Sequence, residues 1–206
     1  MDVSRETFLR DQLEILEKGC REWGIGLSQA QMEKFSLYIE SLLLWNQRIN
    51  LISSRDMERL AKRHLLESLA PLKLVPIKEG EEILDLGSGA GLPGLPLKIV
   101  RSDLRLSLVE STRKKVLFLQ KMVDLLRFSD MEVFWKRGEE LVGRQWGLIL
   151  SRAALRMDDL LPLSFSLLRK GGRLLAFREG GQRWGGEELE IGVFQRTLRV
   201  SLFTKN

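Results

Sequence analysis

The chain has 206 residues, of which 44% are hydrophobic, and this size and composition suit one α/β domain with a modest extension. A single cysteine and a single histidine exclude a disulfide framework and any zinc site built from those residue types. The net charge of +5 favours an anionic partner, because lysines and arginines gain affinity by releasing the counterions of phosphates.

The start of the chain and its apolar runs predict a soluble protein of the cytoplasm. The stretch 1–6 is acidic and polar overall, and no apolar run follows it, so no signal peptide is expected. No run approaches the roughly 20 apolar residues that span a bilayer, and no membrane partner is expected. The lone cysteine fits a reducing compartment. We expect a monomer.

Residues 1–78 predict a helical N-terminal extension. Apolar residues at helical spacing indicate a first helix over 8–20. Ser28 is a good N-cap for a second helix. A third helix is expected to begin at 54–56 and to run to Pro71.

Residues 79–206 predict one α/β domain that packs with the extension into a compact unit. Short apolar runs alternate with helical stretches and indicate strands over 82–86, 104–110, 131–135, 147–151 and 173–178. A helix is expected to end at Gly171 and Gly172, which suit its C-cap, and residues 193–203 alternate as a closing hairpin strand. Strands that alternate with helices imply right-handed crossovers and a parallel sheet.

A glycine-rich turn, Asp85-Leu-Gly-Ser-Gly-Ala-Gly-Leu-Pro-Gly94, follows the first predicted strand directly. Open α/β sheets bind ligands at the carboxyl ends of their strands, near the point where the strand order reverses. Gly87, Gly89 and Gly91 have no Cβ, so the backbone can adopt positive φ and approach a ligand closely. The turn therefore predicts a binding site for a nucleotide-like ligand.

The alternative is a dinucleotide fingerprint, because Gly89, Gly91 and Gly94 spell G-x-G-x-x-G. However, that pattern begins three residues after the apparent strand end, and Asp85 would place a carboxylate against pyrophosphate. A cationic ligand without phosphate suits Asp85 better, and S-adenosylmethionine carries both an ammonium and a sulfonium group. We predict this cofactor. A nicotinamide oxidoreductase, which would tolerate Asp85→Asn, is the competing hypothesis.

The ends of the later strands carry further candidates. Glu110 closes the second strand 23 residues after Gly87, where an acid can accept hydrogen bonds from both ribose hydroxyls. Gly138 and Glu139 follow the third strand and are placed to line the adenine. Arg152 ends the fourth strand and is expected to contact cofactor or RNA.

The chain resembles the RsmG (GidB) family, which methylates N7 of a guanine in bacterial 16S ribosomal RNA. The resemblance covers nearly the whole chain and is carried by Trp45-Asn46 with Asn50-Leu51, Arg63 to Ser68, Asp85 to Pro96, Glu110 to Leu119, Arg137 to Glu139, and Ser151 to Ala153. It implies a class I S-adenosylmethionine-dependent methyltransferase fold, a Rossmann-like sheet flanked by helices, with a helical N-terminal extension.

The resemblance also implies the contacts of the cofactor and the partner. S-adenosylmethionine would contact Gly87, Leu92, Gly138, Glu139 and Arg152, with Glu110 at the ribose. Asp85, Gly89 and Gly91 complete the predicted cofactor site. The implied partner is 16S ribosomal RNA or the 30S subunit, with Lys114, Lys115 and Arg196 as RNA contacts, and no metal is expected.

Some positions depart from the family pattern. Glu67 and Glu110 stand where the family usually has aspartate, and Glu179 replaces a lysine on the RNA-facing side. The segment before Arg196 is also shorter than usual. These departures keep the cofactor assignment and alter the expected RNA-contact surface.

The implied reaction requires no general base. Guanine N7 has a lone pair and no proton, so it can attack the sulfonium methyl group directly. Catalysis is expected to rest on orientation, which can supply about 7–11 kcal/mol. We interpret His64 as a helix-packing residue and Trp184 as a possible stacking partner for a base. Methyl transfer to another RNA, a protein or a small molecule, and RNA binding without chemistry, stay open as alternatives.

Overall fold

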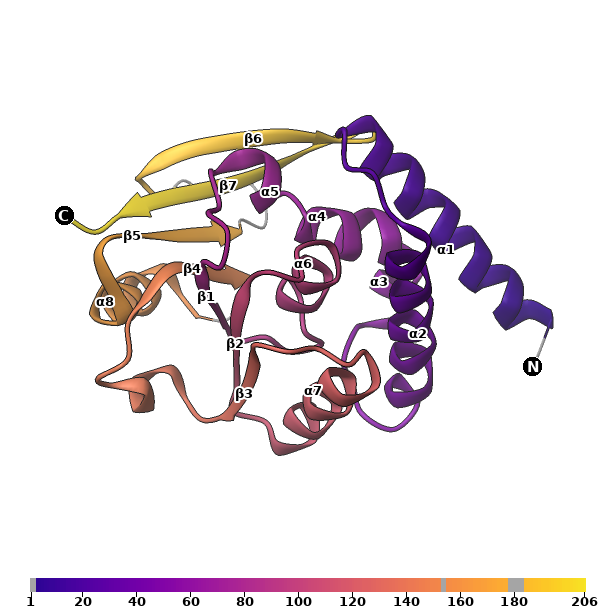
Figure 1. Ribbon diagram of the computed structural model, residues 1–206, viewed down its shortest axis with the longest axis horizontal. Coiled ribbons are helices and arrows are strands. Elements are labelled where there is room, and N and C mark those ends of the chain that lie inside the picture. Colours follow the sequence, from indigo (N-terminus) through magenta and orange to yellow (C-terminus); the bar gives the residue numbers. More distant parts are fainter. Residues whose placement is uncertain (1–2, 153–154, 178–183) are drawn as a thin grey trace.

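A computed structural model describes residues 3–152, 155–177 and 184–206, which form a seven-stranded sheet with helices on both faces (Figure 1). The strand order is β3-β2-β1-β4-β5-β7-β6. Strands β1 to β5 are parallel, and β7 runs antiparallel to both of its neighbours. The strands are β1 (Glu82–Leu86), β2 (Arg105–Glu110), β3 (Met131–Trp135), β4 (Trp146–Arg152), β5 (Leu168–Phe177), β6 (Glu187–Val193) and β7 (Arg196–Thr204).

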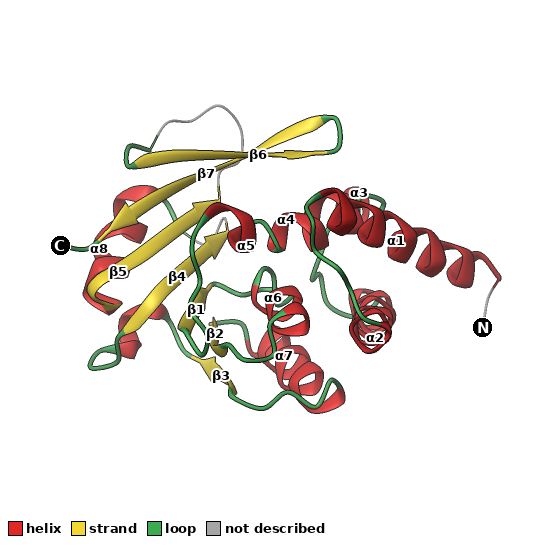
Figure 2. Cartoon of the chain, turned by 45° about the horizontal axis from the view of Figure 1, so that its top comes forward, coloured by secondary structure: helices red, strands yellow, loops and turns green. Residues whose placement is uncertain are grey.

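The helices divide between the two faces of the sheet. Helix α8 packs on one face, whereas α6, α7 and the helices that precede β1 lie on the other (Figure 2). The helical segments are α1 (Val3–Glu22), α2 (Gln29–Asn46), α3 (Ser54–Met57), the π-helix η1 (Leu60–Leu65), α4 (Leu66–Ser68), α5 (Pro71–Leu74), α6 (Gly94–Val100), α7 (Arg113–Leu125), the 3₁₀-helix η2 (Gly138–Leu141) and α8 (Met157–Leu167).

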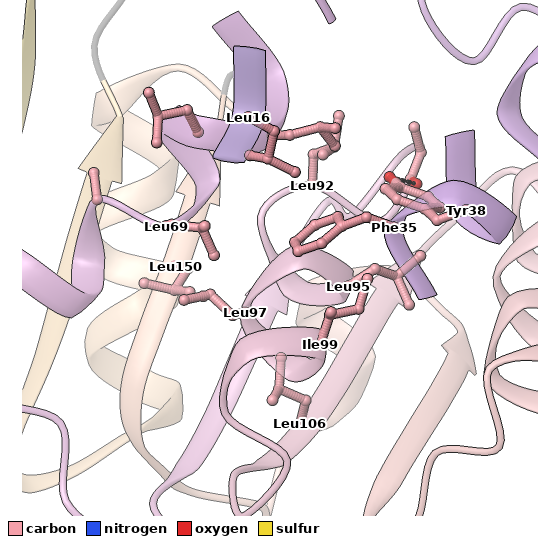
Figure 3. Close-up of a cluster of buried hydrophobic side chains, with 14 of the residues drawn as sticks. Leu16, Phe35, Tyr38, Leu69, Leu92, Leu95, Leu97, Ile99, Leu106 and Leu150 are labelled. Carbon is pink, nitrogen blue, oxygen red and sulfur yellow. Dashed lines mark hydrogen bonds between the residues drawn. The ribbon is translucent and has the colours of Figure 1, made fainter. Parts of the chain in front are cut away.

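Alternation along the strands builds a separate hydrophobic cluster on each face. In β4, Leu150 faces the larger cluster, whereas Ile149 faces the cluster under α8. The larger cluster includes Leu16 of α1, Phe35 of α2 and Leu97 of α6 (Figure 3). The helices before β1 therefore share one core with the sheet, and the proposed division at residue 78 stays a prediction.

The five predicted parallel strands are confirmed, with bounds that agree within one residue for the first four. The capping box of the second helix is also present, because Ser28 Oγ accepts from the N–H of Gln31 and the Gln31 side chain accepts from the N–H of Ser28. The closing strand is β7, and it pairs with β6, a strand that the sequence patterns did not predict. The indole of Trp23, at the end of α1, donates to the carbonyl of Gly192 in β6 at 2.8 Å.

The prediction of one continuous third helix was wrong. The segment is divided into α3, η1 and α4. In an α-helix the N–H of Ala61 would donate to the carbonyl four residues earlier, but here it donates to Gln12 Oε1 at 2.8 Å. A side chain from α1 thus interrupts the hydrogen-bond ladder, and the chain continues as a π-helix in which Leu66 N–H donates to Ala61 O.

The predicted C-cap of α8 was also wrong. The helix ends at Leu167, and Leu168 is already extended and pairs with Trp146 of β4. Gly171 lies inside β5, where its N–H donates to the carbonyl of Lys205 at 2.9 Å. Pairing with β4 and with the end of the chain therefore overrides the local signal of the two glycines.

Tyr38 of α2 connects the helical extension to the glycine-rich turn. Its hydroxyl donates to the carbonyl of Ala90 at 2.7 Å, and its ring lies 6.4 Å from that of Phe118. Tyr38 is fully buried, so water cannot replace this hydrogen bond.

Tyr38→Phe keeps the ring and removes the donor, which leaves the Ala90 carbonyl buried without its partner. We expect the free energy of unfolding to fall by about 1–3 kcal/mol, measured by urea denaturation with an unchanged m-value. A midpoint equal to that of the wild type would show that the hydroxyl does not hold the turn.

Candidate functional site

Hydrogen bonds to Val109 of β2 position the start of the glycine-rich turn. The N–H groups of Gly87 and Ser88 both donate to the carbonyl of Val109 at 3.0 Å, and Ser88 Oγ accepts from the N–H of Val109 at 3.1 Å. Gly87, Gly89 and Gly91 have φ of +78°, +56° and +89°. The turn follows β1, which lies where the strand order reverses between β1 and β4.

Two of these glycines face different surroundings. A Cβ on Gly91 would lie 2.2 Å from Leu95 Cδ1, so the protein itself excludes a side chain there. A Cβ on Gly89 would meet only the carbonyl of Gly87, at 3.9 Å. Gly91 therefore serves packing, whereas Gly89 presents bare backbone to open space that a ligand can occupy.

A cavity of about 460 Å³ lies at the carboxyl ends of β1, β2 and β4. Its lining includes these residues from the predicted sites: Gly87, Gly89, Glu110, Lys115, Gly138, Glu139 and Arg152. The tertiary structure thus brings most of the predicted cofactor residues to one cavity. Asp85, Gly91 and Leu92 are buried outside its lining.

Asp85 supports the turn from inside the protein. Its side chain is fully buried at the end of β1, and Oδ2 accepts from the N–H of Gly94 at 2.9 Å. Burial raises the pKa of the Asp85 carboxyl to about 7, although the Gly94 hydrogen bond acts in the opposite direction. Asp85 Oδ2 thus binds the start of α6, and the contact between Asp85 and a cationic ligand stays a prediction.

Glu110 connects the turn to α7. Its Oε2 accepts from the N–H of Gly89 at 3.1 Å, and its Oε1 accepts from the N–H of Thr112 at 2.7 Å. Each carboxylate oxygen can accept a second hydrogen bond, and the carboxylate lines the cavity. Glu110 can therefore receive ribose hydroxyls without releasing the backbone that it holds.

A buried carboxylate, Glu67, gathers two arginines beside the cavity. Glu67 is 3% exposed; its Oε2 lies 3.1 Å from Arg152 Nη2, and its Oε1 lies 3.1 Å from Arg196 Nη1. Arg152 also donates to the carbonyl of Arg63 at 2.8 Å. In the sequence, Glu67 stands out only as a departure from the family pattern, although an acid within the apolar segment 65–70 indicates a buried ion pair.

His64 lies in the same region but is a poor acid or base. Its Nε2 lies 3.7 Å from Asp56 Oδ1. Burial and the positive charge of Arg152 lower the pKa of His64 to about 3, although Asp56 opposes them. The imidazole is therefore neutral near pH 7. The contact between Asp56 and His64 was not predicted from the sequence, because it depends on how α3 and η1 pack.

The other candidates lie in separate places. Lys114 lines a different cavity, between α2 and α7. Trp184 packs against the cluster under α8, and its stacking on a base stays a prediction. Ala153 and Glu179 lie outside the described residues. Within the described ranges, no group of three or more His, Cys, Asp or Glu side chains can hold a metal ion, and no helix is long and apolar enough to cross a membrane.

The sequence model of the GidB family, described as rRNA small subunit methyltransferase G, matches residues 31–194. The chain belongs to this family. Ribosomal RNA small subunit methyltransferase G of Chloroflexus aggregans is 40% identical over 192 residues, which cover 86% of this chain and 74% of the relative. The protein of the same name from Roseiflexus sp. is 36% identical over 215 residues, which cover 91% of this chain and 90% of the relative.

Solved structures place this GidB family member in the class I methyltransferase fold. The 16S rRNA methyltransferase RsmC of T. thermophilus, determined with AdoMet and guanosine, has a TM-score of 0.53 at 19% identity and covers 69% of this chain and 42% of its own. A methyltransferase from Pyrococcus furiosus has a TM-score of 0.55 at 14% identity and covers 68% and 82%. The fold class predicted from the sequence is confirmed.

Alanine substitutions at Gly91 and Gly89 should affect stability and cofactor binding differently. Gly91→Ala places a Cβ against Leu95 at positive φ, and we expect a loss of about 1–3 kcal/mol in the free energy of unfolding. Gly89→Ala avoids that clash and costs about 1 kcal/mol for its φ, but its methyl group enters the cavity and should weaken S-adenosylmethionine binding. Chemical denaturation and calorimetric titration measure the two effects. Equal losses of stability in both variants would contradict the assignment.

The pKa of Asp85 predicts a pH dependence of stability. Because the folded-state pKa of about 7 exceeds the ordinary aspartate pKa of 3.8, the stabilisation from protonated Asp85 is complete below about pH 4 and is lost as the pH rises through 7. Asp85→Asn cannot ionise and still accepts from Gly94. The unfolding free energy of the wild type should therefore fall relative to the variant between pH 4 and 8, on the order of 2–4 kcal/mol.

Chemical denaturation of both proteins across this pH range provides the measurement. His64, whose pKa is lowered in the folded state, contributes a stabilisation that is lost as the pH falls below about 6.5. It does so in both proteins, so the difference between them isolates Asp85. Parallel stability curves would show that Asp85 does not change its protonation on folding.

Proposed function

We propose that this protein transfers a methyl group from S-adenosylmethionine to N7 of a guanine in the 16S ribosomal RNA of the small subunit. The observation that carries the proposal is the cavity at the ends of β1, β2 and β4. There the open backbone of Gly89 meets the carboxylate of Glu110, in a chain of the rRNA small subunit methyltransferase G family. This arrangement suits a nucleoside cofactor whose ribose is held by an acid.

The residues around the cavity suit the parts of the cofactor. Glu110 would accept the ribose hydroxyls, and the backbone of Gly87 and Gly89 would lie along the nucleoside. Gly138 is buried in η2 and Glu139 is exposed beside it, at the side where the adenine is expected. When bound, S-adenosylmethionine supplies an electrophilic methyl group on a sulfonium.

The choice of guanine N7 agrees with the side chains near the cavity. An acceptor with no proton needs no base, and His64, with a pKa of about 3, is too weak a base to remove one. Glu67 holds Arg152 at the end of β4 with little freedom, since the Arg152 side chain is 10% exposed. We infer that catalysis rests on orientation, with Arg152 as a positioning residue. Lys115 and Arg196 would contact the RNA.

The test is incubation with radiolabelled S-adenosylmethionine and either 30S subunits or naked 16S ribosomal RNA, followed by mass analysis of the modified nucleotide. We expect 7-methylguanosine at one position. Label in neither substrate would overturn the proposal. Label on an exocyclic amine would overturn the N7 assignment, and label only in another RNA, a protein or a small molecule would favour the other methyltransferase hypotheses.

Glu110→Ala should weaken cofactor binding. It removes the acceptors for the ribose and for the N–H of Gly89, and we expect the Kd for S-adenosylmethionine to rise by about 10- to 100-fold. Glu110→Asp should lose less, because the carboxylate is retained. Calorimetric titration measures the affinity, and Glu190→Ala, in the exposed part of β6, is the matched control. An unchanged Kd in Glu110→Ala would exclude the ribose contact.

A further inference from the structure

A second cavity, of about 440 Å³, lies between the end of α2 and the first half of α7, and we call it the α2–α7 groove. Its lining residues are Leu44, Trp45, Gln47, Arg48, Ile49, Lys114 and Leu117. The groove adjoins the cofactor cavity through the first turn of α7. Lys114 lines the groove, whereas Lys115 lines the cofactor cavity. The two hollows therefore lie on either side of the same helix start.

The groove presents apolar surface that the fold leaves uncovered. Leu44 is 51% exposed and Leu117 is 49% exposed, although both are large hydrophobic residues. Trp45, at the end of α2, has its ring edge-on to that of Phe118 in α7, at 5.7 Å between centroids and 64° between planes. This contact and packing against the larger cluster restrict the indole. A preoriented aromatic ring in an apolar setting is the platform on which nucleic acid bases stack.

The charges of the groove are complementary to a polyanion. Arg48 and Lys114 are both exposed, and the lining of the groove contains no carboxylate. The first turn of α7 reads Arg113, Lys114, Lys115 and contains no acid. An apolar peptide carries no negative charge to pair with these cations, whereas an RNA strand carries a phosphate with every base.

We propose that the α2–α7 groove binds an unpaired nucleotide that flanks the target guanine. Its base would pack against Trp45 between the two exposed leucines, and adjacent phosphates would contact Arg48 and Lys114. The proposal rests on the proposed function, because an RNA strand that enters the cofactor cavity past Lys115 continues over the start of α7. The groove thereby selects substrates in which the target lies in single-stranded RNA.

The double variant Arg48→Glu and Lys114→Glu tests the proposed phosphate contacts. The matched control is Lys18→Glu with Lys170→Glu, which changes the same charge at exposed positions on α1 and at the start of β5. We expect the Kd for 16S ribosomal RNA and the KM for methyl transfer to rise about tenfold or more in the groove variant and less than about twofold in the control. The Kd for S-adenosylmethionine should be unchanged in both.

The salt dependence of binding separates phosphate contact from stacking. Losing two phosphate contacts should reduce the slope of log K against log salt by about 1.4 for single-stranded RNA. Leu44→Ser with Leu117→Ser should weaken binding about fivefold with an unchanged slope, because it removes apolar packing beside the base and no charge. Leu125→Ser, which is 38% exposed farther along α7, is the control for this variant.

A photocrosslink identifies the occupant directly. With p-benzoylphenylalanine in place of Leu117, irradiation of the complex with 30S subunits should attach the protein to 16S ribosomal RNA. A crosslink to a ribosomal protein would overturn the proposal, and so would groove variants that bind and methylate like their controls. After either of these two outcomes, methylation of ribosomal RNA by the wild type would show that only the groove proposal had failed. A wild type that methylates neither substrate would instead mean that the proposed function itself had failed.

Discussion

The carboxylate of Glu110 joins the two backbone segments on which both cavities depend. The carboxylate accepts from the N–H of Gly89 in the glycine-rich turn and from the N–H of Thr112, which immediately precedes α7. The turn forms one wall of the cofactor cavity, and the first turn of α7 separates that cavity from the α2–α7 groove. Glu110 therefore links the backbone of the turn, which lines one cavity, to the start of α7, which lines both.

Three acids in and around the site have different surroundings and different contacts. Asp85 is sealed under the turn, where burial raises its pKa and the N–H of Gly94 is its backbone partner. Glu110 holds backbone and still lines the cavity. Glu67 is buried and forms ion pairs with Arg152 and Arg196. The same functional group thus supports the turn at Asp85, lines the cavity at Glu110 and centres two ion pairs at Glu67, according to its solvation and its neighbours.

The elements that the sequence predicted well are those whose signal is local. The strands of the parallel sheet are buried apolar runs, and the helix capped by Ser28 carries its own capping box. The failures arose where a distant residue intervenes. Gln12 takes the N–H of Ala61 and breaks a helix that the periodicity favours, and Lys205 pairs with Gly171 where a C-cap was expected. No window of local sequence contains both partners of either contact.

For the site, the sequence by itself determined which ligand chemistry was possible. The glycines after the first strand and the acid at the end of the second strand are spaced so that a parallel sheet must bring them together. The tertiary structure decided which of these residues reach the cavity, because burial removed Asp85, Gly91 and Leu92 from its surface. It alone revealed Glu67 as the partner of two arginines and Trp45 as the wall of a groove. Those contacts join residues far apart in the chain, and only packing specifies them.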